Sequence, residues 1–251
     1  MHHVDLNKVW LSAGNHESRE DGTCLMEAVS WWAGEEHTSS PACVSPVLRW
    51  VGIALNDALP DEPRQRLRPL IPDLAGTAGD DLDHIRGWIA ADWVIRTWAP
   101  EWLDLAGLGQ DAASLRALSP VTSTWEARCA RPTVRLVHAH SYDLSIDAAE
   151  NAYRKGRPRP AVRLLWAAAD EIGAPAWDAT RTPESGARSE GDQGALRDAW
   201  SAARLATEAA ACQIAIREPA SVEAAMAAAC APVLERLQDS ASRLFTRMIR
   251  I

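Results

Sequence analysis

Long apolar runs, lysines and strand-forming stretches are scarce in this sequence of 251 residues. No stretch reaches the roughly 18 apolar residues of a membrane span, and the N-terminus lacks the charged start and apolar segment of a signal peptide. Only Lys8 and Lys155 are lysines, and the net charge is -8, which disfavours nucleic acid and anionic membranes as partners. We therefore expect a soluble, cytoplasmic protein that binds other proteins or further copies of itself.

Runs of Val, Ile and Thr are also rare, whereas the good helix formers Ala, Arg, Leu and Glu are abundant. With 47% hydrophobic residues the chain has enough apolar surface for a sizeable core. This composition predicts an all-α fold. The segment 133–145 alternates in the manner of a strand, but the neighbouring sequence is helical and we expect a helix there too.

We expect an irregular multi-helix N-terminal domain over residues 1–173, followed by a C-terminal helical hairpin or bundle over residues 195–251. Between them, residues 174–194 are rich in Gly, Ser, Pro and charge, which predicts a flexible linker. A basic run, RKGRPRP from Arg154, resembles a phosphate-binding patch, but in an acidic chain it is better interpreted as a solvated turn.

Two helix starts stand close together between Asp21 and Leu59. The first helix begins near Cys24 and stops at Gly34, a residue that commonly ends helices. The second has Ser45 as its cap and Pro46 as its first residue, and it ends before Pro60. A third helix, capped by Asp80 and Asp81, carries tryptophans at helical spacing, which we interpret as core packing.

The same stretch holds the one close group of metal-ligand side chains, Cys24, Glu27, His37 and Cys43, in the spacing C-x2-E-x9-H-x5-C. Cys24 and Glu27 are three apart and share a helix face. The loop that follows is long enough to fold back and bring the other two residues to them, which would suit a tetrahedral zinc ion. His16, in the preceding loop, is a spare ligand candidate.

Two other interpretations of this group stay open. In one of them, Cys24 is a small buried residue, Glu27 and His37 are solvated, and Cys43 is a loop thiol. In the other, Cys24 is a nucleophile activated by the positive end of a helix, with Glu27, His37 or a more distant histidine as base. The five cysteines include no C-x-x-C pair, so the sequence predicts no disulfide framework.

The segment from Gly22 to Glu27 resembles the nucleophile position of papain-like cysteine peptidases, in which a cysteine begins a helix after a glycine-containing turn. This resemblance implies a catalytic Cys24 with a base on another element, for which His138 or His140 would serve. It also implies a sheet that carries the base.

Residues 21–79, with CLMEAV, a GE-x-H turn and a C-x-x-P-V helix start, resemble uncharacterised proteins of actinobacteria and their phages, and the ending LFTRMIRI resembles some phage members. This resemblance implies a phage or actinobacterial source and no particular reaction. Our first hypothesis is a helical protein with a structural zinc site that acts through protein contacts. The alternative is a cysteine- or zinc-dependent hydrolase centred on Cys24.

Overall fold

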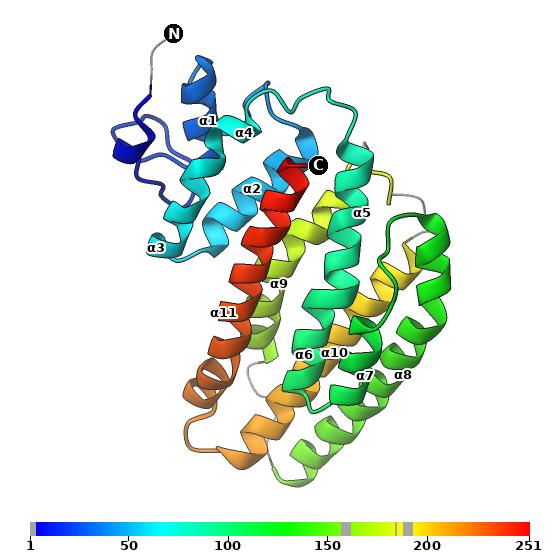
Figure 1. Cartoon of the computed structure of the whole chain (residues 1–251). Helices are drawn as coiled ribbons and strands as arrows, with labels where there is room; N and C mark the ends of the chain where they lie inside the picture. Colours follow the sequence, from blue (N-terminus) through cyan, green and yellow to red (C-terminus); the bar gives the residue numbers. More distant parts are fainter. Residues whose placement is uncertain (1–3, 157–161, 184, 188–192) are drawn as a thin grey trace. The chain divides into compact units, whose positions relative to one another are not determined.

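The computed structural model describes residues 4–156, 162–183, 185–187 and 193–251, and within these ranges the chain is helical with no strand. The all-α prediction is therefore confirmed (Figure 1). Segment 133–145 lies inside one long helix, as expected. None of the helices in the described ranges is both long enough and apolar enough to cross a membrane. Residues 157–161 of the basic run lie outside the described part of the chain.

The chain divides into two compact units that interleave in sequence. Unit 1 comprises Met1–Ala90, Ala174–Gly186 and Gln238–Ile251, and unit 2 comprises Ala91–Gly173 and Ala187–Leu237. The predicted domain boundaries at residues 173 and 195 differ from this division, because residues of the predicted N-terminal domain belong to both units. Part of the predicted linker is helical, since a helix continues through Pro175 to Ala179.

Unit 1 is built from short helices and ends of longer ones. Its elements are η1 (Leu6–Lys8), α1 (Leu25–Ala33), α2 (Pro46–Ala58), α3 (Asp61–Arg64), η2 (Gln65–Leu70), α4 (Ile71–Leu74), most of α5 (Asp83–Trp93), the end of α9 (Val162–Ala179) and the end of α11 (Val222–Ile249). Helix α1 packs against α2 and α4. Gly52 of α2 lies against the side chains of Met26 and Phe245, so this crossing has room for a hydrogen but not for a methyl group.

The ends of α1 and α2 follow the local signals in the sequence. Ser45 accepts a hydrogen bond from the Leu48 amide, and Pro46 begins α2 as predicted. Gly34 ends α1 in the left-handed conformation, with φ of 76°. The cap of α1 is Cys24 itself, and Glu27 accepts a hydrogen bond from the Cys24 amide.

Unit 2 is organised around two long helices. Its elements are the end of α5, the π-helix η3 (Val94–Trp98), α6 (Ala99–Leu105), α7 (Gly109–Arg116), α8 (Thr124–Arg154), the start of α9 (Val162–Ala179), α10 (Gly194–Arg217) and most of α11. Helices α8 and α10 lie side by side over much of their length (Figure 1). They approach closely because the buried face of α8 consists of small residues at spacings of three and four: Ala127, Ala130, Val134, Val137, Ser141, Ser145, Ala148 and Ala152.

The tryptophan stripe belongs to the core. Trp98 stacks on Trp200 with ring centroids 4.3 Å apart, and its Nε1 donates to the Ala169 carbonyl at 3.2 Å. Gly173 lies against the same Nε1 edge of Trp98, where a Cβ would come within 2.5 Å of the ring. Trp102 is fully buried as well. Trp88 and Trp93 of α5 are buried too, so the packing interpretation of these tryptophans is confirmed.

Candidate functional site

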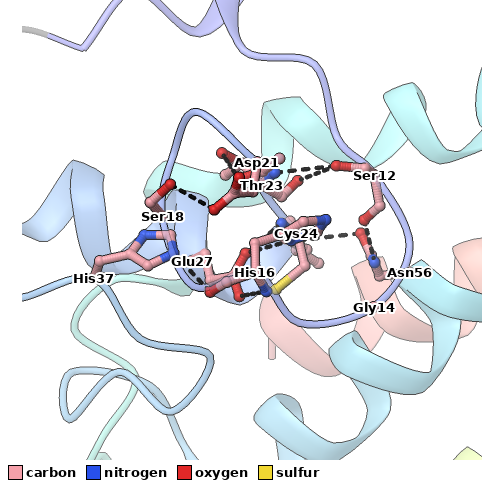
Figure 2. Close-up of polar contacts among 12 residues, drawn as sticks. Ser12, Gly14, His16, Ser18, Asp21, Thr23, Cys24, Glu27, His37 and Asn56 are labelled. Atoms are coloured by element: carbon pink, nitrogen blue, oxygen red, sulfur yellow. Dashed lines mark hydrogen bonds and ion pairs between the residues drawn. The ribbon is translucent and has the colours of Figure 1, made fainter.

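The loop before α1 is folded onto the start of that helix (Figure 2). The Ser12 amide donates to the Thr23 carbonyl at 2.9 Å, and the Thr23 amide donates to Ser12 Oγ at 3.0 Å. Asn56 of α2 donates to the Ser12 carbonyl and accepts from the Leu25 amide. Gln65 of η2 both donates to and accepts from the Leu11 backbone. Side chains from two other helices thus set the path of this loop.

Glu27 is the centre of the cluster. Its side chain is 2% exposed, and its carboxylate accepts three hydrogen bonds: from the Cys24 amide at 2.8 Å, from the His16 amide at 2.9 Å and from His16 Nδ1 at 2.9 Å. Burial by itself would raise the pKa of Glu27, but the hydrogen bonds from Cys24 and His16 lower it below its usual value. Glu27 is therefore a buried carboxylate held ionised by amide and imidazole donors.

Glu27 pairs with His16, a residue outside the set of four predicted ligands. The His16 side chain is 11% exposed, and its ring lies against Gly22, where a Cβ would come within 2.4 Å of Cδ2 and Nε2. His37 reaches the same loop through its Nε2, which is 3.1 Å from the His16 carbonyl oxygen. The contact between His16 and Glu27 joins the loop before α1 to the helix itself. Residue spacing within one helix therefore could not predict this contact.

Cys24 is 2% exposed and begins α1. Burial and the nearby negative charge of Glu27 raise the pKa of the Cys24 thiol to about 12, although backbone hydrogen bonds oppose this effect. At neutral pH the side chain is thus a protonated thiol. The Met26 and Glu27 amides at the positive end of the helix hydrogen-bond to the Cys24 sulfur and lower its pKa, but burial outweighs them.

Cys43 lies in a second cluster, with Glu35. The Cys43 amide donates to Glu35 Oε1 at 2.9 Å, and the Ala42 amide donates to Oε2 at 2.8 Å. The Cys43 carbonyl accepts from the Gly76 and Ala78 amides. Burial and the Glu35 carboxylate raise the pKa of the Cys43 thiol to about 11. Through these hydrogen bonds, Cys43 stabilises the turn that leads into α2.

The four predicted ligands therefore do not meet at one point. Cys24 and Glu27 are in contact, His37 joins them only through the His16 carbonyl, and Cys43 is bound to Glu35. Among the residues that the structure describes, no three His, Cys, Asp or Glu side chains are arranged to hold a metal ion. The loop brings His37 to the His16 carbonyl but does not bring Cys43 to Cys24 and Glu27. Hydrogen bonds from His16 also occupy the Glu27 oxygens that would face a metal.

The residues proposed as distant bases have their own partners in unit 2. His138 Nε2 is 3.0 Å from Ser201 Oγ, and His140 Nδ1 is 2.9 Å from Asp111 Oδ1. No strand occurs in the described ranges to carry a base in the manner of papain-like peptidases. With a buried, protonated thiol at Cys24, the geometry gives the nucleophile interpretation no support.

No family model, no curated protein and no solved structure matches this chain. The resemblance of residues 21–79 to actinobacterial and phage proteins accordingly stays a prediction, and the function has to be argued from the geometry alone.

Proposed function

We propose that this chain is a cytoplasmic helical protein that acts by binding other proteins, and that the outward face of α8 is its contact surface. One observation carries the proposal. Of the nine exposed large apolar side chains in the described ranges, five lie on α8: Trp125, Leu136, Tyr142, Ile146 and Tyr153. Exposed apolar surface gathered on one element is typical of an interaction site.

Two of these side chains are almost fully in water. Trp125 is 71% exposed and Tyr153 is 83% exposed. Tyrosine and tryptophan are the residues most enriched at the energetic centres of protein interfaces, because each combines a large apolar area with few rotatable bonds. The net charge of -8 supports a protein partner over nucleic acid. All five cysteines are free, which fits a reducing compartment.

In this proposal the cluster around Glu27 is a structural clasp. It ties the loop before α1 to the first turn of that helix, and it presents no activated nucleophile. The clasp holds the N-terminal segment of unit 1 against α2 and η2 through Asn56 and Gln65. Its role is therefore the stability of unit 1.

Photo-crosslinking in the cells that encode the protein tests the proposal. A benzophenone amino acid replaces Tyr142, which is 52% exposed on α8, and in a matched control it replaces Trp50, which is 54% exposed on α2. We expect a discrete protein adduct from position 142 and none from position 50. Equal adducts from both positions, or none from either, would contradict the proposal.

A zinc ion at Cys24, Glu27, His37 and Cys43 stays a prediction from the sequence. The side chains as placed do not fit the ion, since Cys43 would have to leave Glu35 and Glu27 would have to release His16. Elemental analysis of purified protein, together with melting curves with and without a chelator, decides the question. One equivalent of zinc and a lower melting temperature with chelator would establish the site, and neither result is expected from the present arrangement.

A further inference from the structure

The exposed charged side chains of α8 are basic in its first half and acidic in its second half as far as Glu150, and Arg154 in the last turn is basic again. Arg128 and Arg135 lie on the outward face of its first half, and Asp143 and Glu150 lie on that of its second half. In the part of the chain that the structure describes, none of these four side chains has an ion-pair or hydrogen-bond partner. Each half of this face is thus left with an uncompensated charge of opposite sign.

The outward face is also symmetric about Ala139, which is exposed at the middle of the helix. Residues at equal distances on either side of Ala139 match in character: Trp125 with Tyr153, Pro132 with Ile146, Leu136 with Tyr142, Arg128 with Glu150, and Arg135 with Asp143. Apolar residues are matched with apolar ones, and basic residues with acidic ones.

We infer that the partner of this face is a second copy of the same chain, with α8 of one copy packed antiparallel on α8 of the other. This inference rests on the proposed function, because it names the partner of the same surface. A two-fold axis at Ala139 brings every matched pair to the same height along the two helices. Arg128 of one copy then faces Glu150 of the other, about 16 Å from the axis, and each such contact occurs twice.

A parallel arrangement in register would place Arg128 and Arg135 beside the same arginines of the other copy, and like charges at an interface are unfavourable. Antiparallel packing removes this repulsion. Arg128 and Glu150 also differ by only about 40° around the helix, so both lie near the middle of the contact. The small side chain of Ala139 allows the two axes to approach to about 8 Å where they cross.

A shallow hollow on α8 provides a seat for an aromatic side chain. It is lined by Ala149, Glu150, Tyr153 and Arg154. In the antiparallel arrangement, Trp125 of the second copy lies at the height of Tyr153, beside this hollow. A tryptophan ring there would contact the tyrosine and the guanidinium of Arg154. Trp125 is therefore expected to be the main anchor of the contact.

The contact involves one helix from each copy. A helix of this length is about 46 Å long, and a single-helix contact is at the small end of stable interfaces, which bury roughly 800 Å² per partner. We therefore expect a concentration-dependent equilibrium between one and two chains.

Sedimentation equilibrium over a range of protein concentrations measures this equilibrium. Arg128→Glu and Glu150→Arg are each expected to raise the dissociation constant at least about tenfold, because each places like charges in contact twice. The double variant restores opposite charges and should recover the wild-type value. Arg217→Glu makes the same charge change at an exposed site on α10 and should have no effect. A single chain at every concentration, or no recovery in the double variant, would overturn the inference.

The anchor is tested by Trp125→Ala, for which we expect a dissociation constant about 30-fold higher. Trp50→Ala removes an exposed tryptophan from α2 and is the matched control. Circular dichroism of both variants checks that the helices are intact. An unchanged equilibrium for Trp125→Ala would remove the proposed anchor and with it the antiparallel register.

Disulfide formation reports the direction of the two helices. In a background with Cys129→Ser, Ala139→Cys should cross-link to itself on oxidation. Trp125→Cys should cross-link only when mixed with Tyr153→Cys, because these positions meet across the two-fold axis. Efficient self-cross-linking of Trp125→Cys would indicate parallel helices and overturn the inference.

The photo-crosslinked adduct from position 142 separates this inference from the proposed function. An adduct with the mass of two chains supports both. An adduct with a different protein, from a chain that does not self-associate, leaves the proposed function standing and overturns the second copy as partner.

Discussion

At the scale of single residues, the arrangement of the cluster depends on which hydrogen-bond donors reach Glu27. The carboxylate sits at the third position of α1, where free amide groups favour a negative charge. A cysteine in front of it looks like an activated nucleophile in the sequence. In the structure Glu27 accepts from the Cys24 amide, and burial together with the charge of Glu27 keeps the thiol neutral.

Replacing Glu27 by Gln should destabilise the protein at pH 7 by about 2 kcal/mol, because three donors lose a charged acceptor. The pKa of Glu27 is lowered in the folded protein, so its contribution is fully present above the unfolded value of about 4.3 and is lost as the pH falls through the folded pKa. Urea unfolding followed by tryptophan fluorescence should therefore show a smaller difference between the two proteins at pH 3.5 than at pH 7.

The control for this experiment is Glu36→Gln, at an exposed position just after α1. It should change the free energy of unfolding by less than about 0.5 kcal/mol at either pH. A Glu27→Gln difference that grows in acid would show that the carboxylate is not the stabilising form.

Cys24 should be the least reactive kind of cysteine in the folded chain. Its thiol is buried and its pKa is raised to about 12, so very little thiolate exists at pH 8. Iodoacetamide treatment of native protein followed by peptide mass mapping should label the exposed Cys129 and leave Cys24 unmodified. Labelling of Cys24 ahead of Cys129 would revive the nucleophile hypothesis.

Gly22 and Gly14 offer a comparison within one loop. Both have positive φ, 146° and 83°, but a Cβ at Gly22 would strike the His16 ring, whereas one at Gly14 would meet nothing within 4 Å. Gly14→Ala should cost about 1 kcal/mol for backbone strain alone. Gly22→Ala should cost at least twice as much in the same unfolding assay, since His16 must move away from Glu27. Equal costs would mean that the histidine contact contributes little.

At the scale of elements, the start of α5 is joined to the end of α11 by a buried arginine. Arg86 has no exposed surface, and its guanidinium donates to Asp80, Asp83 and the Met248 carbonyl. Asp80, one of the two predicted caps, and Asp83, in the first turn of α5, thus neutralise a charge inside unit 1. Ser45, the cap of α2, hydrogen-bonds to Asp83 and extends the network.

Arg86→Met should lower the free energy of unfolding by about 3 to 5 kcal/mol, because it leaves two acidic groups and a carbonyl without their donor. Arg66→Met is the control, since it breaks an exposed pair with Asp239 and should cost less than about 1 kcal/mol. Thermal or urea unfolding of the two variants provides the measurement. Similar costs for both would contradict the buried network.

At this scale, local signals in the sequence predicted several helix ends. Ser45, Pro46 and Gly34 predicted helix ends correctly, because a cap depends on residues within one turn. Helix α5 continues through the π-helix η3 into α6, although Pro100 lies in this stretch. Proline is accommodated there in the first turn of α6, where its missing amide costs little.

At the scale of the whole molecule, the acidic net charge limits the partners. We expect no binding to duplex DNA at physiological salt tighter than the roughly 1 μM of the strongest non-specific binders, because phosphate contacts require clustered basic residues. Fluorescence anisotropy with labelled duplex measures this, with a basic DNA-binding protein as positive control. Tight binding that weakens with salt would instead point to the basic run from Arg154.

By itself, the sequence determined the helical class, the ends of α1 and α2 and the packing role of the tryptophans, because propensity, caps and periodicity act over a few residues. Only the tertiary structure decided that Glu27 binds His16, that Cys43 binds Glu35, and that the predicted ligands stay apart. The pairing of Glu27 with His16 depends on where Asn56 and Gln65 hold a loop that is distant from them in the chain. Hydrogen bonds between segments that are distant in the chain produce no periodic pattern in the sequence. Only the folded structure therefore shows them.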